Sequence, residues 1–80
     1  MRYRTAPLSA AQMACMWSAV EKARTAHRQA RDAFQRFESA RVHGGSLGDE
    51  ISLFHERMVA YRLAVTNLRQ AADQIRHRTV

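Results

Sequence analysis

Two uninterrupted heptad patterns of apolar residues constrain the fold of this chain more than any other feature. The apolar positions follow one another in alternating steps of three and four, which is the spacing of a helix that packs along one seam. In the first segment they are Met16, Ala19, Ala23, Ala26, Ala30, Ala33, Phe37 and Ala40. In the second segment they are Ile51, Phe54, Met58, Tyr61, Val65, Leu68, Ala72 and Ile75. We therefore predict an all-α chain with two long helices.

Capping signals predict where the first helix begins. Ser9 is followed three residues later by Gln12, which is the spacing of a capping box. We expect this helix to cover about residues 10–42, a length of roughly 50 Å at 1.5 Å per residue. Residues 1–6 precede the capping signal and are expected to form a flexible arm.

The glycine-rich segment 43–48 is predicted to form the turn between the helices. Its first glycines can adopt the left-handed conformation that ends a helix. Ser46 with Asp49, or Asp49 alone, can cap a second helix over about residues 50–76. We therefore expect the chain 1–80 to form a single helical-hairpin domain.

The two seams differ in size in a way that predicts how the helices pair. A short turn makes the helices antiparallel neighbours, which places Ala30 opposite Tyr61 and Ala23 opposite Leu68. Small residues opposite large ones fill an interface well. Two helices alone bury little apolar surface for their length. We expect a homodimer that forms an antiparallel four-helix bundle, and the alternative is that a different protein covers the open face.

The segment from Met13 to Trp17 is apolar on nearly every face of the predicted helix. One interpretation is structural: the segment is the wide end of the core, packed against Ile75 and against the arm through Tyr3. The other is functional: Met13 and Trp17 form an exposed patch for a protein partner, because Trp and Met are common in contact surfaces.

The chain is strongly basic, with a net charge of +6, and Lys22 is the single lysine among thirteen Lys and Arg residues. Arginine suits phosphate and carboxylate ligands, but a GC-rich genome gives the same bias. Cys15 is the single cysteine, so no internal disulfide can form, which fits a reducing compartment. No stretch approaches the roughly 18 apolar residues that a membrane span needs. We expect a soluble, cytoplasmic protein that does not bind membranes.

Basic residues gather at the end of the hairpin where the two termini meet. Seven of the thirteen cations, but only two of the seven anions, lie in residues 1–24 and 66–80. The predicted partner-binding residues at this end are Met13, Trp17, Arg2, Arg4, Arg69, Arg76 and Arg78. An alternative basic face on the helix flanks consists of Arg24, Arg28, Arg31 and Arg62. The plainer interpretation is a solvated surface with ion pairs such as Arg28–Asp32 and Arg69–Asp73.

No arrangement of residues predicts catalysis, a cofactor or a metal. The histidines lack the His-x-x-x-His or Glu-x-x-His spacing of metal-binding helices. His27 is expected to be a partly buried, hydrogen-bonded side chain, and Cys15 an unreactive, partly buried thiol. We therefore do not expect an enzyme.

Two functions remain open from the sequence. The first is a small interaction module, such as an adaptor, inhibitor or regulatory subunit, that presents a helix face to a larger protein. The second is a nucleic-acid-binding regulator whose arginines contact phosphates. Near the basic end only Trp17 and Tyr3 could stack on bases, which favours the protein partner.

Overall fold

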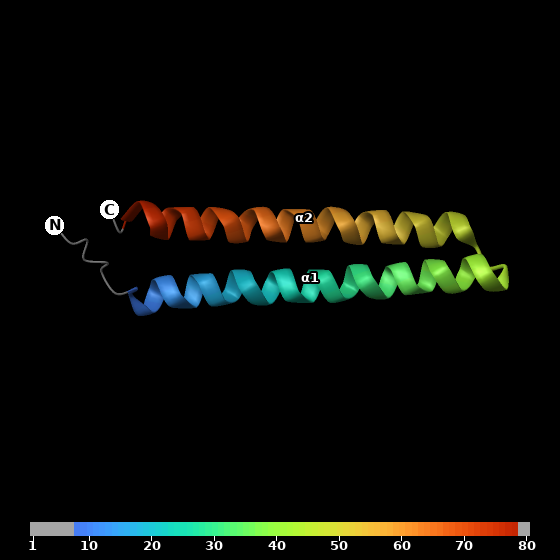
Figure 1. The fold of residues 1–80 in the computed structure, drawn as a ribbon, viewed down its shortest axis with the longest axis horizontal. Coiled ribbons are helices and arrows are strands. Elements are labelled where there is room, and N and C mark those ends of the chain that lie inside the picture. Colours follow the sequence, from blue (N-terminus) through green and yellow to red (C-terminus); the bar gives the residue numbers. More distant parts are fainter. Residues whose placement is uncertain (1–7, 79–80) are drawn as a thin grey trace.

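The protein consists of two long helices that lie side by side and are joined by a tight turn (Figure 1). In this computed structural model, which describes residues 8–78, helix α1 spans Ala10–His43 and helix α2 spans Leu47–Arg78. The start of α1 and the end of α2 lie at the same end of the molecule (Figure 1). The predicted all-α hairpin is confirmed for the described residues, and the arm predicted for residues 1–6 lies outside them.

The capping box that the sequence predicts is present at the start of α1. The Gln12 backbone N–H donates to Ser9 Oγ at 3.1 Å, and the Ser9 backbone N–H donates to Gln12 Oε1 at 2.9 Å. These bonds satisfy N–H groups that a helix N-terminus leaves without an intrahelical acceptor. The first helix therefore begins where its sequence directs.

Glycine ends α1 in the predicted way. Gly44 adopts the left-handed conformation, with φ of 78°, and its N–H donates to the Ala40 carbonyl at 2.8 Å. The Gly45 N–H donates to the same carbonyl at 2.9 Å. A Cβ atom on Gly45 would lie 3.1 Å from the Cβ atom of Ala40, so this position also favours glycine.

The turn is shorter than the predicted segment 43–48, because α2 begins at Leu47 rather than near residue 50. Ser46 precedes the helix, and its hydroxyl donates to Asp49 Oδ2 at 3.0 Å. Asp49 lies in the first turn, where the helix dipole favours an acidic side chain. The expected start near residue 50 corresponds to Asp49 as the cap, but the helix begins directly after Ser46, so Gly48 lies in the first turn of α2 and not in the connection.

The interface between the helices is built on three alanines of α1. Ala26, Ala30 and Ala33 are the buried apolar side chains among the described residues, with 9%, 5% and 3% of their surface exposed. Because alanine is small, the backbones can approach closely along this row. Larger side chains are consequently displaced to the two sides of the contact.

Aromatic pairs show the register in which the helices meet. The ring centroids of His27 and Tyr61 lie 5.4 Å apart, and those of Phe34 and Phe54 lie 5.5 Å apart. Ala30 and Tyr61 line the same hollow between the helices, which agrees with the antiparallel order that the sequence predicts. The antiparallel pairing read from the sequence is therefore present in the structure.

Polar contacts join the helices as well. Arg57 Nη1 donates to Gln29 Oε1 at 3.5 Å. Arg36 Nε lies 3.5 Å from Glu50 Oε2, a pairing that links the C-terminal part of α1 to the first turn of α2. Exposed and long contacts of this kind contribute little stability, so the apolar seam remains the main source.

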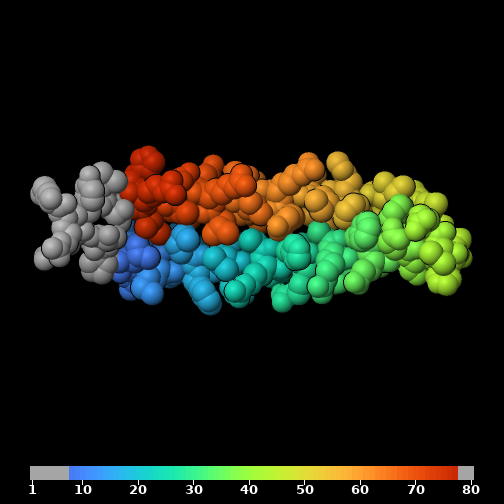
Figure 2. Space-filling view, in the orientation of Figure 1, coloured from blue at the N-terminus to red at the C-terminus, as the bar shows by residue number. Residues whose placement is uncertain are grey.

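The hairpin leaves far more surface exposed than a compact domain of its size. Its dimensions are 64 × 20 × 16 Å, and its radius of gyration of 18.2 Å exceeds the roughly 12 Å of a compact 80-residue domain. The accessible surface of 6666 Å² is roughly 1,700 Å² above that of a typical monomer of 9.2 kDa. Figure 2 shows the resulting rod, in which both helices are exposed on the visible face along their length. Neither described helix is apolar enough over a sufficient length to cross a membrane.

The conformation of Gly44 leads to a stability prediction. Gly44→Val should lower the free energy of unfolding by about 1–2 kcal/mol, because a β-branched residue is strained at positive φ. Gly48→Ala is the matched control: a Cβ atom there meets nothing within 4 Å, and its greater helix propensity should not destabilise the chain. Urea unfolding followed by circular dichroism measures both. Equal midpoints for the two variants would contradict the turn geometry.

Candidate interaction site

The N-terminal part of α1 carries an exposed apolar patch formed by Met13 and Trp17. The exposed fractions of these side chains are 58% and 62%. The guanidinium carbon of Arg24 lies 5.8 Å from the centre of the Trp17 ring, close enough for a cation–π contact. Arg24 also pairs with Glu21, with a nitrogen–oxygen distance of 3.2 Å. The described residues therefore do not pack Trp17 into the core, and Tyr3 lies outside them.

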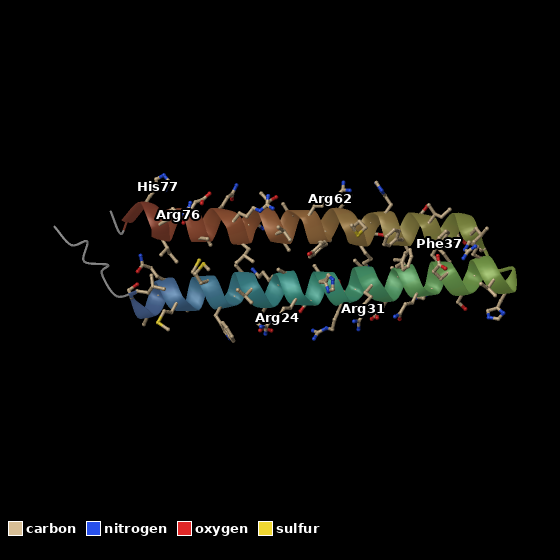
Figure 3. All side chains as sticks on the ribbon, viewed as in Figure 1. Arg24, Arg31, Phe37, Arg62, Arg76 and His77 are labelled. Carbon is tan, nitrogen blue, oxygen red and sulfur yellow. The ribbon has the colours of Figure 1, made fainter. Side chains whose placement is uncertain are left out.

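The antiparallel fold brings part of the predicted terminal arginine cluster to the same end of the molecule. Arg69 and Arg76 are exposed on α2, and Arg76 lies near the end of that helix (Figure 3). Arg2 and Arg4 lie outside the described residues. Arg78 ends α2, and its side chain also lies outside the description. Binding by this cluster stays a prediction.

The alternative basic face is divided between two edges of the hairpin. Arg24 and Arg31 point away from α2, whereas Arg62 points away from α1 on the opposite edge (Figure 3). Arg28, Arg31 and Arg62 are exposed, and within residues 8–78 they form no ion pair or hydrogen bond. The four arginines therefore do not form a single face: three lie in a row along α1, and Arg62 lies apart from them on α2.

The ion pairs differ from those that the sequence suggested. Neither Arg28–Asp32 nor Arg69–Asp73 forms within the described part of the chain. Arg41 instead pairs with Glu38 at 3.0 Å. Several arginines consequently remain available to ligands along the helices.

A groove that the sequence analysis did not identify runs along one side of the helix contact. We call it the aromatic groove, and its two adjoining parts enclose about 480 and 300 Å³ and share His27 and Tyr61. Its apolar lining also includes Val20, Ala23, Ala30, Phe34, Phe54, Met58, Val65 and Leu68. Arg24, Arg28 and Arg31 line its α1 side, and no acidic residue lines it.

A second groove differs in the size and charge of its lining. This small-residue groove encloses about 380 Å³. Its lining residues are Cys15, Ser18, Ala19, Lys22, Ala60, Leu63, Ala64, Asn67 and Ala71. Lys22 is its single charged residue, so two copies of this surface can meet without strong repulsion.

Two side chains are more exposed than the sequence analysis expected. His27 is exposed, and its main contact is with the ring of Tyr61 rather than a hydrogen bond. Cys15 is an exposed free thiol at the small-residue groove. Both lie at the flanks of a contact so narrow that only alanines are buried in it.

The described residues contain no candidate metal site. No three His, Cys, Asp or Glu side chains within residues 8–78 are grouped so that they could hold a metal ion. The His77 ring nitrogen Nδ1 lies 2.8 Å from the Asp73 carbonyl oxygen, a local contact within α2.

Comparison with known proteins adds no assignment. No protein-family model matches the chain, and no curated protein or solved structure shows significant similarity to it. The function must therefore be inferred from the surfaces themselves.

The exposure of Trp17 can be tested directly, since it is the only tryptophan of the chain. Acrylamide should quench Trp17 fluorescence in the folded protein nearly as efficiently as in urea, because most of the ring faces solvent. Stern–Volmer titrations on the same sample, folded and unfolded, provide the comparison. Strong protection in the folded state would show that another segment or a second copy covers the ring.

Proposed function

We propose that the chain is a small, non-enzymatic interaction module, acting as an adaptor, inhibitor or regulatory subunit, that binds a larger protein through a helix face. The observation that supports this proposal is that small apolar side chains are buried while many large ones are exposed. Among the described residues, the buried apolar side chains are three alanines. The large apolar side chains that remain exposed are Leu8, Met13, Trp17, Phe34, Val42, Leu47, Ile51, Val59 and Leu63. Contiguous exposed apolar patches mark sites of protein association, and Met13 and Trp17, four positions apart on α1, form such a patch.

The proposed partner contact is the patch of Met13 and Trp17 together with the terminal arginines. Trp and Arg are the residue types that most often dominate binding energy at protein interfaces. Arg24 lies against the Trp17 ring and so places a cation beside the apolar surface. Because its single cysteine cannot form an internal disulfide, we place this module in the cytoplasm.

A homodimer is part of the same proposal. The excess accessible surface of roughly 1,700 Å² per chain corresponds to an interface of the size found in obligate dimers, about 2,000–5,000 Å² in total. The small-residue groove suits this contact, because its alanines permit close helix approach and its lining carries a single charge. Pairing through this groove would form a four-helix bundle and leave the aromatic groove open.

A nucleic-acid-binding regulator is the second candidate. The exposed arginines on both edges, among them Arg28, Arg31 and Arg62, favour it because they lack ion-pair partners within residues 8–78. Phosphate contacts would use these arginines without any need for the exposed apolar patch. The protein partner accounts for both features and is therefore preferred.

The proposed dimer can be tested with two matched variants of α2. Leu63→Glu places a charge in the small-residue groove, whereas Val59→Glu places one on an exposed position outside both grooves; the exposed fractions of the original side chains are 61% and 51%. Light scattering at micromolar concentration should find a dimer for the original chain and for Val59→Glu. Leu63→Glu should be monomeric. A monomeric original chain would exclude the homodimer.

The mode of partner binding can be tested with the native partner recovered by pull-down with and without nuclease. Trp17→Ala should weaken the free energy of binding to a protein partner by about 2 kcal/mol or more. Val42→Ala, at the other end of α1, should change that binding little. For nucleic acid, the affinity should instead fall steeply as salt rises. A plot of log affinity against log salt concentration should have a slope of about −0.7 to −0.9 for each phosphate that the protein neutralises. If nuclease treatment abolishes capture of the partner and Trp17→Ala does not change it, the nucleic-acid-binding regulator is favoured.

A further inference from the structure

The shape of the aromatic groove suits the binding of a third helix. On α1 its lining follows Val20, Ala23, His27, Ala30 and Phe34, and on α2 it follows Phe54, Met58, Tyr61, Val65 and Leu68. Both sets repeat in steps of three and four, so the walls are ridges of the kind into which another helix packs. The part of α1 that lines the groove is about four helical turns, or roughly 21 Å, long.

The charge of this groove determines what kind of helix can occupy it. Arg24, Arg28 and Arg31 line its α1 side, and no acidic residue lies along it. Arg28 and Arg31 have no ion-pair partner within the described residues, so their guanidinium groups are available to carboxylates. Carboxylates are the anions of proteins that arginine binds in paired, charge-assisted hydrogen bonds.

A second copy of the chain is a poor occupant of this groove. Two copies pairing through it would bring two such arginine rows into one interface, and the groove supplies no carboxylate to neutralise them. Like charges brought together in this way oppose association. The small-residue groove carries one cation, Lys22, per copy, so this repulsion is smaller there.

Single-stranded nucleic acid also fits less well. Base stacking needs open aromatic faces, but the Phe34 and Phe54 rings pack against each other, and Tyr61 packs against His27. The rest of the lining is aliphatic or alanine. Leucine-type side chains match that surface better than bases do.

We propose that the aromatic groove binds an acidic amphipathic helix of a partner protein. The apolar side of that helix packs against the lining around Tyr61, and its flanking carboxylates pair with Arg28 and Arg31. This inference rests on the proposed function and adds the chemical class of the partner and a second contact surface. Met13 and Trp17 are then a separate contact beyond the end of the groove.

The probe for this proposal is a synthetic helical peptide of about 18 residues, roughly 27 Å long, with Leu at heptad seam positions and Glu at both flanks. A scrambled peptide of the same composition controls for charge alone. Fluorescence anisotropy of the labelled peptides, titrated with the full chain, gives the affinities. We expect the amphipathic peptide to bind at least tenfold more tightly than the scrambled one.

Paired variants of the chain locate the binding surface. Arg28→Gln with Arg31→Gln removes two charges from the groove and should weaken peptide binding about tenfold, equivalent to about 1.4 kcal/mol. Arg36→Gln with Arg41→Gln removes two charges from α1 outside both grooves and should change binding less than about twofold. Arg28→Glu with Arg31→Glu should reverse the preference, so that a peptide with Lys in place of Glu binds better. All are exposed positions, and circular dichroism checks that helicity is retained.

Four results of the peptide titrations would overturn the proposal. They are no binding at about 1 mM peptide, equal binding of the scrambled peptide, equal effects of the two Gln pairs, or displacement of the peptide by a tighter-binding single-stranded oligonucleotide. A dimer that Phe34→Glu dissociates and Leu63→Glu does not would assign the groove to a second copy, which also overturns it. If the peptide fails while Trp17→Ala still weakens the native protein partner, the proposed function stands and only this inference falls.

Discussion

The close contact of Ala26, Ala30 and Ala33 with α2 is the interaction on which the rest of the structure depends. Alanine on α1 permits the helices to approach closely, but it provides little apolar area to bury. The larger residues of the seam, such as Tyr61 on α2, then lie beside the contact rather than under it, and they are only partly covered. A narrow contact therefore produces both the stability that the hairpin has and the two grooves along its sides.

The two grooves differ because the flanks of the alanine row differ. On one flank α1 carries Val20, His27 and Phe34, interspersed with arginines, and this flank forms the aromatic groove. On the other flank it carries small and polar residues beside Cys15, and this flank forms the small-residue groove. A chain with one charged and one nearly neutral groove can bind two different surfaces without competition between them. Because the two grooves are separate, a chain could form a dimer through one and bind a partner through the other at the same time.

The sequence predicted the features that depend on local or periodic signals. The heptad spacing gave the hairpin and its register, and the Ser9 capping box gave the start of α1. The start of α2 expected near residue 50 corresponds to Asp49 as the cap, whereas in the structure the helix begins at Leu47, directly after Ser46, the other cap that the sequence offers. The exposure of His27 was missed because heptad patterns indicate direction and not the width of the contact. The aromatic groove depends on residues from both helices at once, so neither helix considered alone could reveal it.

The small core also links the stability of this chain to its associations. Folding of a domain is usually supported by large buried side chains, but none of the described side chains has less than 2% of its surface exposed. Any partner that binds only the folded hairpin adds to its stability by mass action, in proportion to the logarithm of the free partner concentration. The apolar surface that the alanine seam leaves uncovered is thus the same surface through which association stabilises the fold. For this reason the free hairpin and the bound hairpin should differ mainly in stability and little in backbone conformation, since the helices and the Gly44 turn are formed by contacts within the chain.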